Sequence, residues 1–145
     1  MQYFLRPRLG NGKELDYFEG MNIVRLSSAL VTYHEGVLIF EFQNNVEIGE
    51  KEAREQLAAG LKLAQGKPCP VIIVDNHPLT TVTPEARNIL SKASPEIPRL
   101  CEAFVVSTLA KKVMVNFYIK VQKPANPAKV FTGFSQAWRW AKSFT

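Results

Sequence analysis

The side chains best suited to catalysis or ligand binding lie in one stretch of the chain, residues 75–87. Asp75 could act as an acid, His77 as a base and Thr83 as a hydroxyl group if the fold brought the three together. The same residue types are common in loops, where they form turns and helix caps. We therefore expect binding rather than catalysis here. The residues of this expected binding site are Asp75, His77, Thr80, Thr81, Thr83, Glu85 and Arg87.

Sequence signatures of catalytic and metal centres are absent. The only histidines are His34 and His77, and the two cysteines, Cys69 and Cys101, stand far apart. Metal sites need three or four ligands at suitable spacing, which these residues do not provide. The chain also lacks a nucleophile-elbow serine, a Walker loop and a G-x-G-x-x-G run. We predict a protein that is not an enzyme and that uses no metal and no cofactor.

The residues of the expected site are positioned by a strand–loop–helix unit. Residues 71–74 are four consecutive β-branched side chains, which indicates a strand buried on both faces. Residues 76–82 have no apolar period and predict a loop. Thr83 can cap a helix, Pro84 suits its first position and Glu85 complements the helix dipole. Partners of open α/β sheets commonly bind at the carboxyl ends of such strands.

The rest of the chain predicts an α/β domain around this unit. Residues 23–33 and 37–42 read as two antiparallel strands joined by a turn at His34-Glu35-Gly36, with residues 46–48 extending the second strand past a bulge. The third strand of the core, residues 103–107, is expected to run parallel to the central one. We expect a mixed four- to five-stranded sheet with an N-terminal antiparallel hairpin and about four helices. The helices are expected over residues 50–65, 84–93, 109–121 and 134–144, with a last short strand at 129–132.

A second contact surface is predicted on the helix over residues 109–121. Its apolar residues lie on all sides, which usually means burial on more than one side. Because monomers seldom expose large apolar patches, we expect a second copy of the chain or the N-terminal arm to cover it, with burial in the same subunit as the alternative. In the last helix, Trp140 is the expected core anchor and Trp138 the exposed one. The residues of this expected dimer or partner surface are Val115, Tyr118, Ile119 and Trp138.

Length and composition indicate one domain of a soluble protein. The 145 residues are 46% hydrophobic and 21% charged, ordinary values for a globular domain. We expect residues 1–21 to be a partly ordered N-terminal arm and residues 22–145 the domain. Apolar runs fall well short of the ~20 residues of a membrane helix. Arg6 and Arg8 interrupt any signal peptide, and the isolated cysteines predict buried thiols rather than a disulfide. These features favour a cytoplasmic location.

Positive charge is concentrated in the last third of the chain. The whole sequence carries a net charge of +5, and residues 103–145 contain no acidic residue. Such a segment can attract acidic proteins, anionic lipids or nucleic acid, although a solvated rim of lysines is the alternative. No helix-turn-helix, zinc-finger or RNA-recognition signature is present, so nucleic acid is not an expected partner. The basic residues of this segment are Lys111, Lys112, Lys120, Lys123, Lys129, Arg139 and Lys142.

Several short motifs follow one another in an order that is similar to that of a known family. They are His34-Glu35-Gly36-Val37-Leu38, Pro70-Val71-Ile72-Ile73-Val74-Asp75, Pro84-Glu85-Ala86-Arg87, Asn116-Phe117, Lys123-Pro124 through Pro127, and Val130-Phe131 with Ala137 through Trp140. In this order the chain resembles the STAS domains of anti-sigma-factor antagonists, and most of all the small stand-alone bacterial STAS/SEC14-like proteins of undetermined role. The resemblance covers about residues 23 to 144 and implies a mixed sheet with a recognition loop after the central strand.

The chain departs from that family at one functionally important position. Antagonists carry a phosphorylatable serine, preceded by an aspartate, at the start of the helix after the recognition loop. The resemblance places Thr83, Pro84 and Glu85 there, so the serine switch is not carried over. Glu85 would instead supply a permanent negative charge at the helix start. Thr80 and Thr81 could be modified, but a structural role in the loop is the favoured interpretation.

These observations predict a non-catalytic regulatory or protein-interaction module of STAS-like type. Its expected partner is a protein, with a homodimer as a further option. The alternative is a protein that binds a small anionic ligand, a lipid head group or a membrane surface, suggested by the SEC14-like resemblance and the basic last third. In that case the N–H groups after Thr83 would hold the anion, with Lys120 or Lys123 nearby if the fold brings them there.

Overall fold

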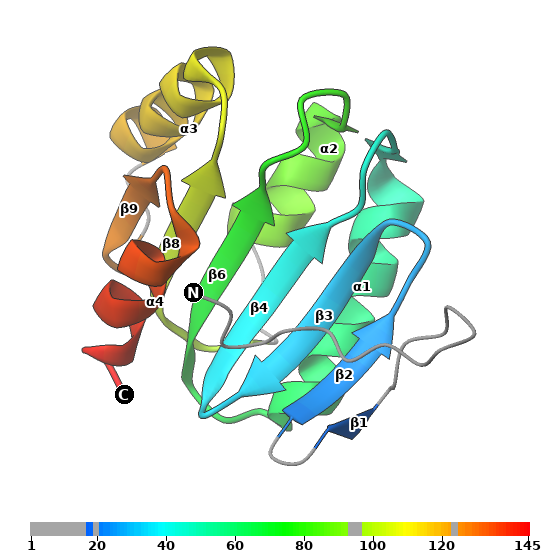
Figure 1. Cartoon of the computed structure of the whole chain (residues 1–145), viewed down its shortest axis with the longest axis vertical. Helices are drawn as coiled ribbons and strands as arrows, with labels where there is room; N and C mark the ends of the chain where they lie inside the picture. Colours follow the sequence, from blue (N-terminus) through cyan, green and yellow to red (C-terminus); the bar gives the residue numbers. More distant parts are fainter. Residues whose placement is uncertain (1–16, 19–20, 93–96, 123–124) are drawn as a thin grey trace.

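A computed structural model of the chain describes residues 17–18, 21–92, 97–122 and 125–145 (Figure 1). Over these residues the main sheet has seven strands in the order β1-β2-β3-β4-β6-β8-β9. The first four pair antiparallel, and β4, β6, β8 and β9 pair parallel, so the sheet is mixed as predicted. The strands are β1 (Tyr17–Phe18), β2 (Met21–Arg25), β3 (Ala29–His34), β4 (Val37–Phe42), β6 (Cys69–Asp75), β8 (Arg99–Val106) and β9 (Ala128–Phe131).

The central position of β6 is confirmed. It lies between β4 and β8, hydrogen-bonded in parallel to both, and residues 69–74 are buried. The turn between β3 and β4 is confirmed as well. Glu35 and Gly36 both adopt positive φ, 50° and 80°, the combination that a two-residue hairpin turn of the right twist requires.

The number of strands in the N-terminal part differs from the prediction. Residues 23–33 form two strands rather than one, because the chain turns at Ser27 and Ser28 between β2 and β3. The Leu26 N–H donates to the Ala29 carbonyl at 2.8 Å and closes this turn. Serine is a common turn residue, and the apparent alternation of apolar residues hid that signal. With β1 added at the edge, the sheet exceeds the four to five strands expected from sequence.

A second difference concerns residues 46–48, which do not extend β4. Instead β5 (Glu47–Ile48) pairs in parallel with β7 (Thr81–Val82) in a separate two-stranded sheet. The N–H groups of Thr81 and Thr83 donate to the carbonyls of Val46 and Ile48, both at 3.0 Å. The predicted loop 76–82 therefore ends in a short strand, tied to the connection between β4 and the first helix.

The helices cover the two faces of the sheet unequally. Figure 1 shows α1 and α2 on one face and α4 on the other. The core of the first face also includes Tyr118 from α3, and that of the second is closed by Ala137, Trp138 and Ala141. No helix of the described residues is long and apolar enough to cross a membrane. The helices are α1 (Glu50–Ala64), α2 (Pro84–Arg87) with a π-helical continuation (Asn88–Lys92), α3 (Leu109–Gln122) and α4 (Phe134–Lys142).

Close packing of α1 against the sheet depends on a glycine. A Cβ atom at Gly60 would lie 2.9 Å from the Phe40 ring and 3.1 Å from the Leu38 side chain, so only glycine lets the helix approach this closely. The start of α1 is fixed by Glu52, whose carboxylate accepts a hydrogen bond from the Gly49 N–H at 2.9 Å. The helix thus packs closely on β3 and β4.

Both cysteines are free thiols buried in the sheet, as the sequence predicted. Burial raises the pKa of the Cys69 thiol to about 11 and that of the Cys101 thiol to about 12. A thiol with a raised pKa is a poor nucleophile and a poor metal ligand at neutral pH. The two residues therefore contribute to packing.

Candidate functional site

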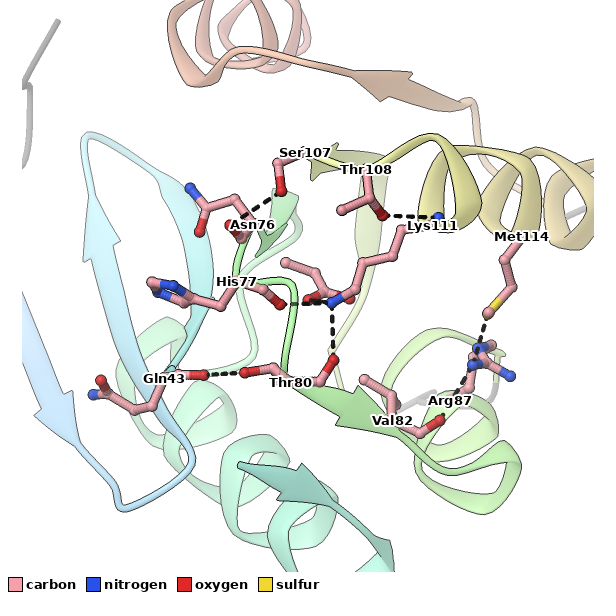
Figure 2. A network of polar contacts seen from close by, with 11 residues as sticks. Gln43, Asn76, His77, Thr80, Val82, Arg87, Ser107, Thr108, Lys111 and Met114 are labelled. Atoms are coloured by element: carbon pink, nitrogen blue, oxygen red, sulfur yellow. Dashed lines mark hydrogen bonds and ion pairs between the residues drawn. The ribbon is translucent and has the colours of Figure 1, made fainter. Parts of the chain in front are cut away.

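The candidate site is the edge of the sheet where β6 and β8 end. Asp75 is the last residue of β6, and the segment 76–80 connects it to β7 and then to α2. Figure 2 shows this edge, with the Lys111 side chain of α3 and the Ser107 side chain after β8 pointing toward backbone carbonyls of the loop. Three of the residues expected from sequence, Asp75, His77 and Thr80, meet here at a residue that the sequence analysis did not select for the site.

That residue is Lys111, in the first turn of α3. Its ammonium group lies 2.5 Å from the Asp75 carboxylate and donates to the carbonyls of His77 at 3.0 Å and Thr80 at 2.9 Å. An ammonium group has three N–H donors, so each one has an acceptor. The position of Lys111 is fixed in turn by Thr108, whose hydroxyl accepts from the Lys111 N–H at 3.1 Å and caps the helix. The lysine holds both ends of the loop.

Further hydrogen bonds attach the loop to the neighbouring strands. Thr80 is 1% exposed, and its hydroxyl donates to the Gln43 carbonyl, after β4, at 2.5 Å. On the other side, the Ser107 hydroxyl donates to the Asn76 carbonyl at 3.1 Å. These bonds are drawn in Figure 2. The loop is thereby held on both flanks, while Leu79 at its tip is 68% exposed.

The predicted helix start after the loop is confirmed. The Thr83 hydroxyl accepts a hydrogen bond from the Ala86 N–H at 3.1 Å, and Pro84 occupies the first helical position. Glu85 is exposed at the helix start. Arg87 connects two helices, because its guanidinium donates to the Val82 carbonyl at 3.2 Å and to the Met114 sulfur, on α3, at 3.0 Å.

The polar groups of this edge are arranged for holding backbone rather than for proton transfer. Burial raises the pKa of the Asp75 carboxyl above its ordinary value, since loss of solvent outweighs the attraction of Lys111. The Thr83 hydroxyl is occupied by the helix cap, and Figure 2 shows the His77 ring pointing away from Lys111. The three groups considered as acid, base and hydroxyl do not converge. Within the described parts of the chain, no group of three or more His, Cys, Asp or Glu residues could hold a metal ion.

The helix start also offers few donors to an anion. Pro84 has no N–H group, and Thr83 already accepts from the Ala86 N–H. The Glu85 carboxylate, at the same end of the helix, would repel an anion. Lys120 is nine residues beyond Lys111 on α3, which places it about 14 Å along the helix. Lys123 lies outside the described residues.

A small apolar cavity lies beside the loop, between the strand ends and the helices α2 and α3. Its volume is about 70 Å³. This is well below the ~300 Å³ of the smallest usual ligand pockets, but it could receive part of one side chain. Its lining is mostly apolar, with Asp75, Arg87 and Lys111 as the charged members. The lining residues are Phe42, Ile73, Asp75, Val82, Arg87, Leu90, Phe104, Val106, Lys111, Met114, Val115 and Tyr118.

The second expected surface was assigned to the wrong sides of its helices. Val115 and Ile119 are half-buried and Tyr118 is buried, and all three pack against the core of their own subunit. Trp138 is buried as well, at 6% exposure, whereas Trp140 is the more exposed of the two tryptophans. The dimer proposal that rested on these four side chains therefore fails. The reason is the direction of approach: α3 turns its Val115 side, rather than its Val113 side, toward the sheet, and apolar residues on all sides of a helix cannot indicate that choice.

The sequence analysis missed Lys111, Gln43 and Ser107. One signal could have found Lys111. The third core strand was expected to run parallel to the central one, so the helix that follows it must begin beside the loop after the central strand. A lysine in the first turn of that helix, close to a half-buried aspartate, then becomes a candidate partner. Gln43 and Ser107 act through a carbonyl and a hydroxyl in connecting segments, and no residue pattern marks them.

Comparison with protein families assigns the chain to a family. Residues 31–145 match a family model described as a domain of unknown function, DUF7793. The chain belongs to the DUF7793 family. Comparison with curated proteins gave no match. The DUF7793 match begins within β3 and covers the rest of the sheet after it, together with the loop, Lys111 and helices α1 to α4.

A solved structure shares the fold of this DUF7793 chain. It is the crystal structure of an uncharacterised protein of the DUF3478 family, with a SpoIIAA-like fold, from Shewanella loihica. The two chains superpose with a TM-score of 0.53 at 13% sequence identity, over 83% of this chain and 91% of the other. This likeness confirms the predicted STAS-like fold. At this identity it shows the fold alone.

Proposed function

We propose that this DUF7793 protein is a non-catalytic regulatory module that binds another protein through the docking edge, defined as residues 76–80 together with Thr83 to Arg87. The observation that carries the proposal is the contrast within the loop. Its backbone is held at both ends by Lys111, while Leu79 is 68% exposed at its tip. Holding an apolar side chain in water on a rigid support reduces the entropy lost on binding, which is a common property of recognition loops.

The chemistry of the edge supports binding over catalysis. The Asp75 carboxylate is paired with Lys111, and the Thr83 hydroxyl caps a helix, so neither is available to a substrate without loss of structure. The exposed groups are those suited to a partner surface: an apolar tip at Leu79 and a carboxylate at Glu85. In protein interfaces such an apolar contact supplies affinity, and a rim charge favours one partner over another.

The proposal is tested by capturing partners from the source organism with the purified chain as bait. We compare wild type with Leu79→Ser combined with Glu85→Lys. The matched control is Leu61→Ser with Glu50→Lys, because Leu61 is also an exposed leucine, at 40%, and Glu50 an exposed glutamate, both on α1. We expect proteins that bind wild type and the control but are lost with the edge variant. Identical capture by all three baits would remove the docking edge from the proposal.

A further inference from the structure

An apolar stripe on α3 is exposed to solvent and has no cover among the described residues. Leu109, Val113, Phe117 and Val121 follow one another at four-residue spacing and are 77%, 59%, 66% and 54% exposed. Met114, beside them, is 46% exposed. We call these five residues the α3 stripe. They are five of the seven large hydrophobic side chains that are exposed in the described chain, so this exposure is concentrated on one helix. Such concentration marks a contact surface rather than scattered surface apolarity.

The stripe continues into the cavity between α2 and α3. Met114 belongs to both, and its sulfur accepts the hydrogen bond from Arg87 across the gap between the two helices. A row of exposed apolar side chains beside a socket of about 70 Å³ is the geometry of a groove that receives a helix, in which one anchor side chain enters the socket. A bilayer surface is broad and flat, so it would leave the socket empty.

The charged side chains of α3 itself are all positive. Lys112 and Lys120 are exposed on α3, and neither ammonium group has an ion-pair partner among the described residues. Residues 103–145 contain no acidic side chain that could balance them. A second copy of the chain, docked by the same face, would bring lysines against lysines, which costs free energy at close range. A partner that carries carboxylates would gain from the same positions.

The size of the stripe also argues against a second copy. A 14-residue helix is about 21 Å long and presents a face about 10 Å wide, or roughly 200 Å². A stable interface between proteins needs about 800 Å² on each partner. The stripe and its socket therefore match a single helix better than a whole domain.

We propose that the α3 stripe and the adjoining cavity bind an acidic amphipathic helix of another protein. Its apolar side chains, at helical spacing, lie along Val113 and Phe117, and one of them enters the cavity beside Met114. Its flanking carboxylates pair with Lys112 and Lys120. The inference rests on the proposed function, because it names the class of partner that the interaction module recognises, and it adds a face next to the docking edge.

The test is a selection from a displayed library of 18-residue helical sequences with random side chains. Wild-type chain is the bait, and Phe117→Ser is the bait for counter-selection. We expect the enriched sequences to combine apolar residues at i, i+3 or i+4, and i+7 with net negative charge. A result in which basic or uncharged sequences are enriched, or in which nothing is enriched on wild type over Phe117→Ser, overturns the inference.

The strongest selected peptide is then synthesised, and its affinity is measured by fluorescence anisotropy. We expect Phe117→Ser to weaken binding at least about 30-fold, as for the central residue of an interface. We expect Lys112→Glu with Lys120→Glu to weaken it about tenfold or more, and added salt to weaken binding to wild type. The matched controls are Leu61→Ser and the pair Lys62→Glu with Lys67→Glu, which remove an exposed leucine and two exposed lysines elsewhere. Controls that weaken binding as much as the stripe variants would overturn the inference.

Two further measurements separate the outcomes. Leu79→Ser is tested against the same peptide, and we expect it to bind the peptide as tightly as wild type does. Loss of binding with Leu79→Ser would assign the peptide to the docking edge and overturn the inference about the stripe. Sedimentation and flotation with anionic vesicles are run on wild type and Phe117→Ser. A dimer of the wild type that Phe117→Ser dissociates, or membrane binding that it abolishes, would assign the stripe to a second copy or to lipid and overturn the proposal.

Discussion

Two ion pairs, one partly buried and one buried, lie at opposite ends of the sheet and differ in their hydrogen bonds. At the carboxyl ends of the strands, Lys111 pairs with Asp75 at 2.5 Å and gives its other two N–H groups to loop carbonyls. At the amino end of β8, Arg99 and Glu102 stand 3.6 Å apart, each side chain only 5% exposed. Among the described residues, one nitrogen of Arg99 and one carboxylate oxygen of Glu102 have no hydrogen-bond partner.

The difference shows what each pair contributes. An ion pair in a dry interior gains little free energy over apolar residues unless its remaining donors and acceptors are satisfied. The Lys111 pair meets that condition and fixes the shape of the loop. The Arg99 pair does not, although Arg99 also donates to the Leu90 carbonyl and so supports the π-helical segment. Burial raises the pKa of the Glu102 carboxyl and lowers that of the Arg99 guanidinium. Both shifts disfavour the charged form, so desolvation of this pair costs folding free energy.

The largest expected effect comes from breaking the poorly bonded pair on one side. Arg99→Leu leaves the Glu102 carboxylate buried without its partner, and we expect the free energy of unfolding to fall by about 3–5 kcal/mol. Arg99→Leu combined with Glu102→Leu should recover most of that loss, since both charges are gone. Urea unfolding followed by circular dichroism measures both. A double variant as unstable as the single one would contradict this expectation and show that the Arg99–Glu102 pair itself stabilises the fold.

The Lys111 pair should behave in the opposite way. Lys111→Met removes the donor of two carbonyls as well as the charge partner of Asp75, and we expect a loss of about 2–3 kcal/mol. Adding Asp75→Asn should give little recovery, because the carbonyls of His77 and Thr80 still lack their donor. Hydrogen exchange should rise at residues 76–80. The control is Lys112→Met, an exposed neighbour, which we expect to change stability by less than about 0.5 kcal/mol. If Asp75→Asn restored the full stability lost in Lys111→Met, the two ion pairs would contribute to stability in the same way, contrary to the prediction.

The pH dependence of stability sharpens the comparison at Glu102. Its raised pKa means that the folded chain binds this proton at a higher pH than the unfolded chain does. Wild type therefore gains stability from this group as the pH falls from 7 through the raised pKa to below the unfolded value, about 4.3. Glu102→Gln cannot gain it. In urea unfolding at several pH values, the advantage of wild type over the variant should grow as the pH falls. An advantage that shrinks on acidification would mean that attraction by Arg99 outweighs burial.

The smallest expected effect is at the helix cap beyond the loop. Thr83→Ala removes the acceptor of the Ala86 N–H, and we expect a loss of about 1 kcal/mol with faster hydrogen exchange in α2. Thr81→Ala, at an exposed threonine two residues earlier, is the control and should change stability less. If the two variants are equal, the cap contributes nothing to the support of the docking edge.

Much of the fold was readable from sequence because its signals are local. The β-branched run of β6, the Glu35-Gly36 turn and the Thr83-Pro84 helix start each depend on neighbours within a few residues. The errors arose where the answer depends on distant residues. The pairing of β5 with β7 joins segments more than thirty residues apart, and the side of α3 that faces the sheet packs on core residues from distant strands. Local periodicity contains neither fact.

The candidate site was predicted in part, for the same physical reason. The sequence located Asp75 and the loop residues, because they follow a strand that is plainly central. It did not locate Lys111, which reaches the loop from 31 to 36 positions further along the chain. The sequence also suggested free donors after Thr83 for an anion, whereas the cap uses the Ala86 N–H.

The two-stranded sheet of β5 and β7 couples two connections that lie far apart in the sequence. The link from β4 to α1 and the link from β6 to α2 share backbone hydrogen bonds, so neither can change length without moving the other. An insertion near residue 45 would shift the tip at Leu79 although the inserted residues are far from it in sequence. In proteins that have this two-stranded sheet, the β4–α1 and β6–α2 connections should therefore change length together or not at all.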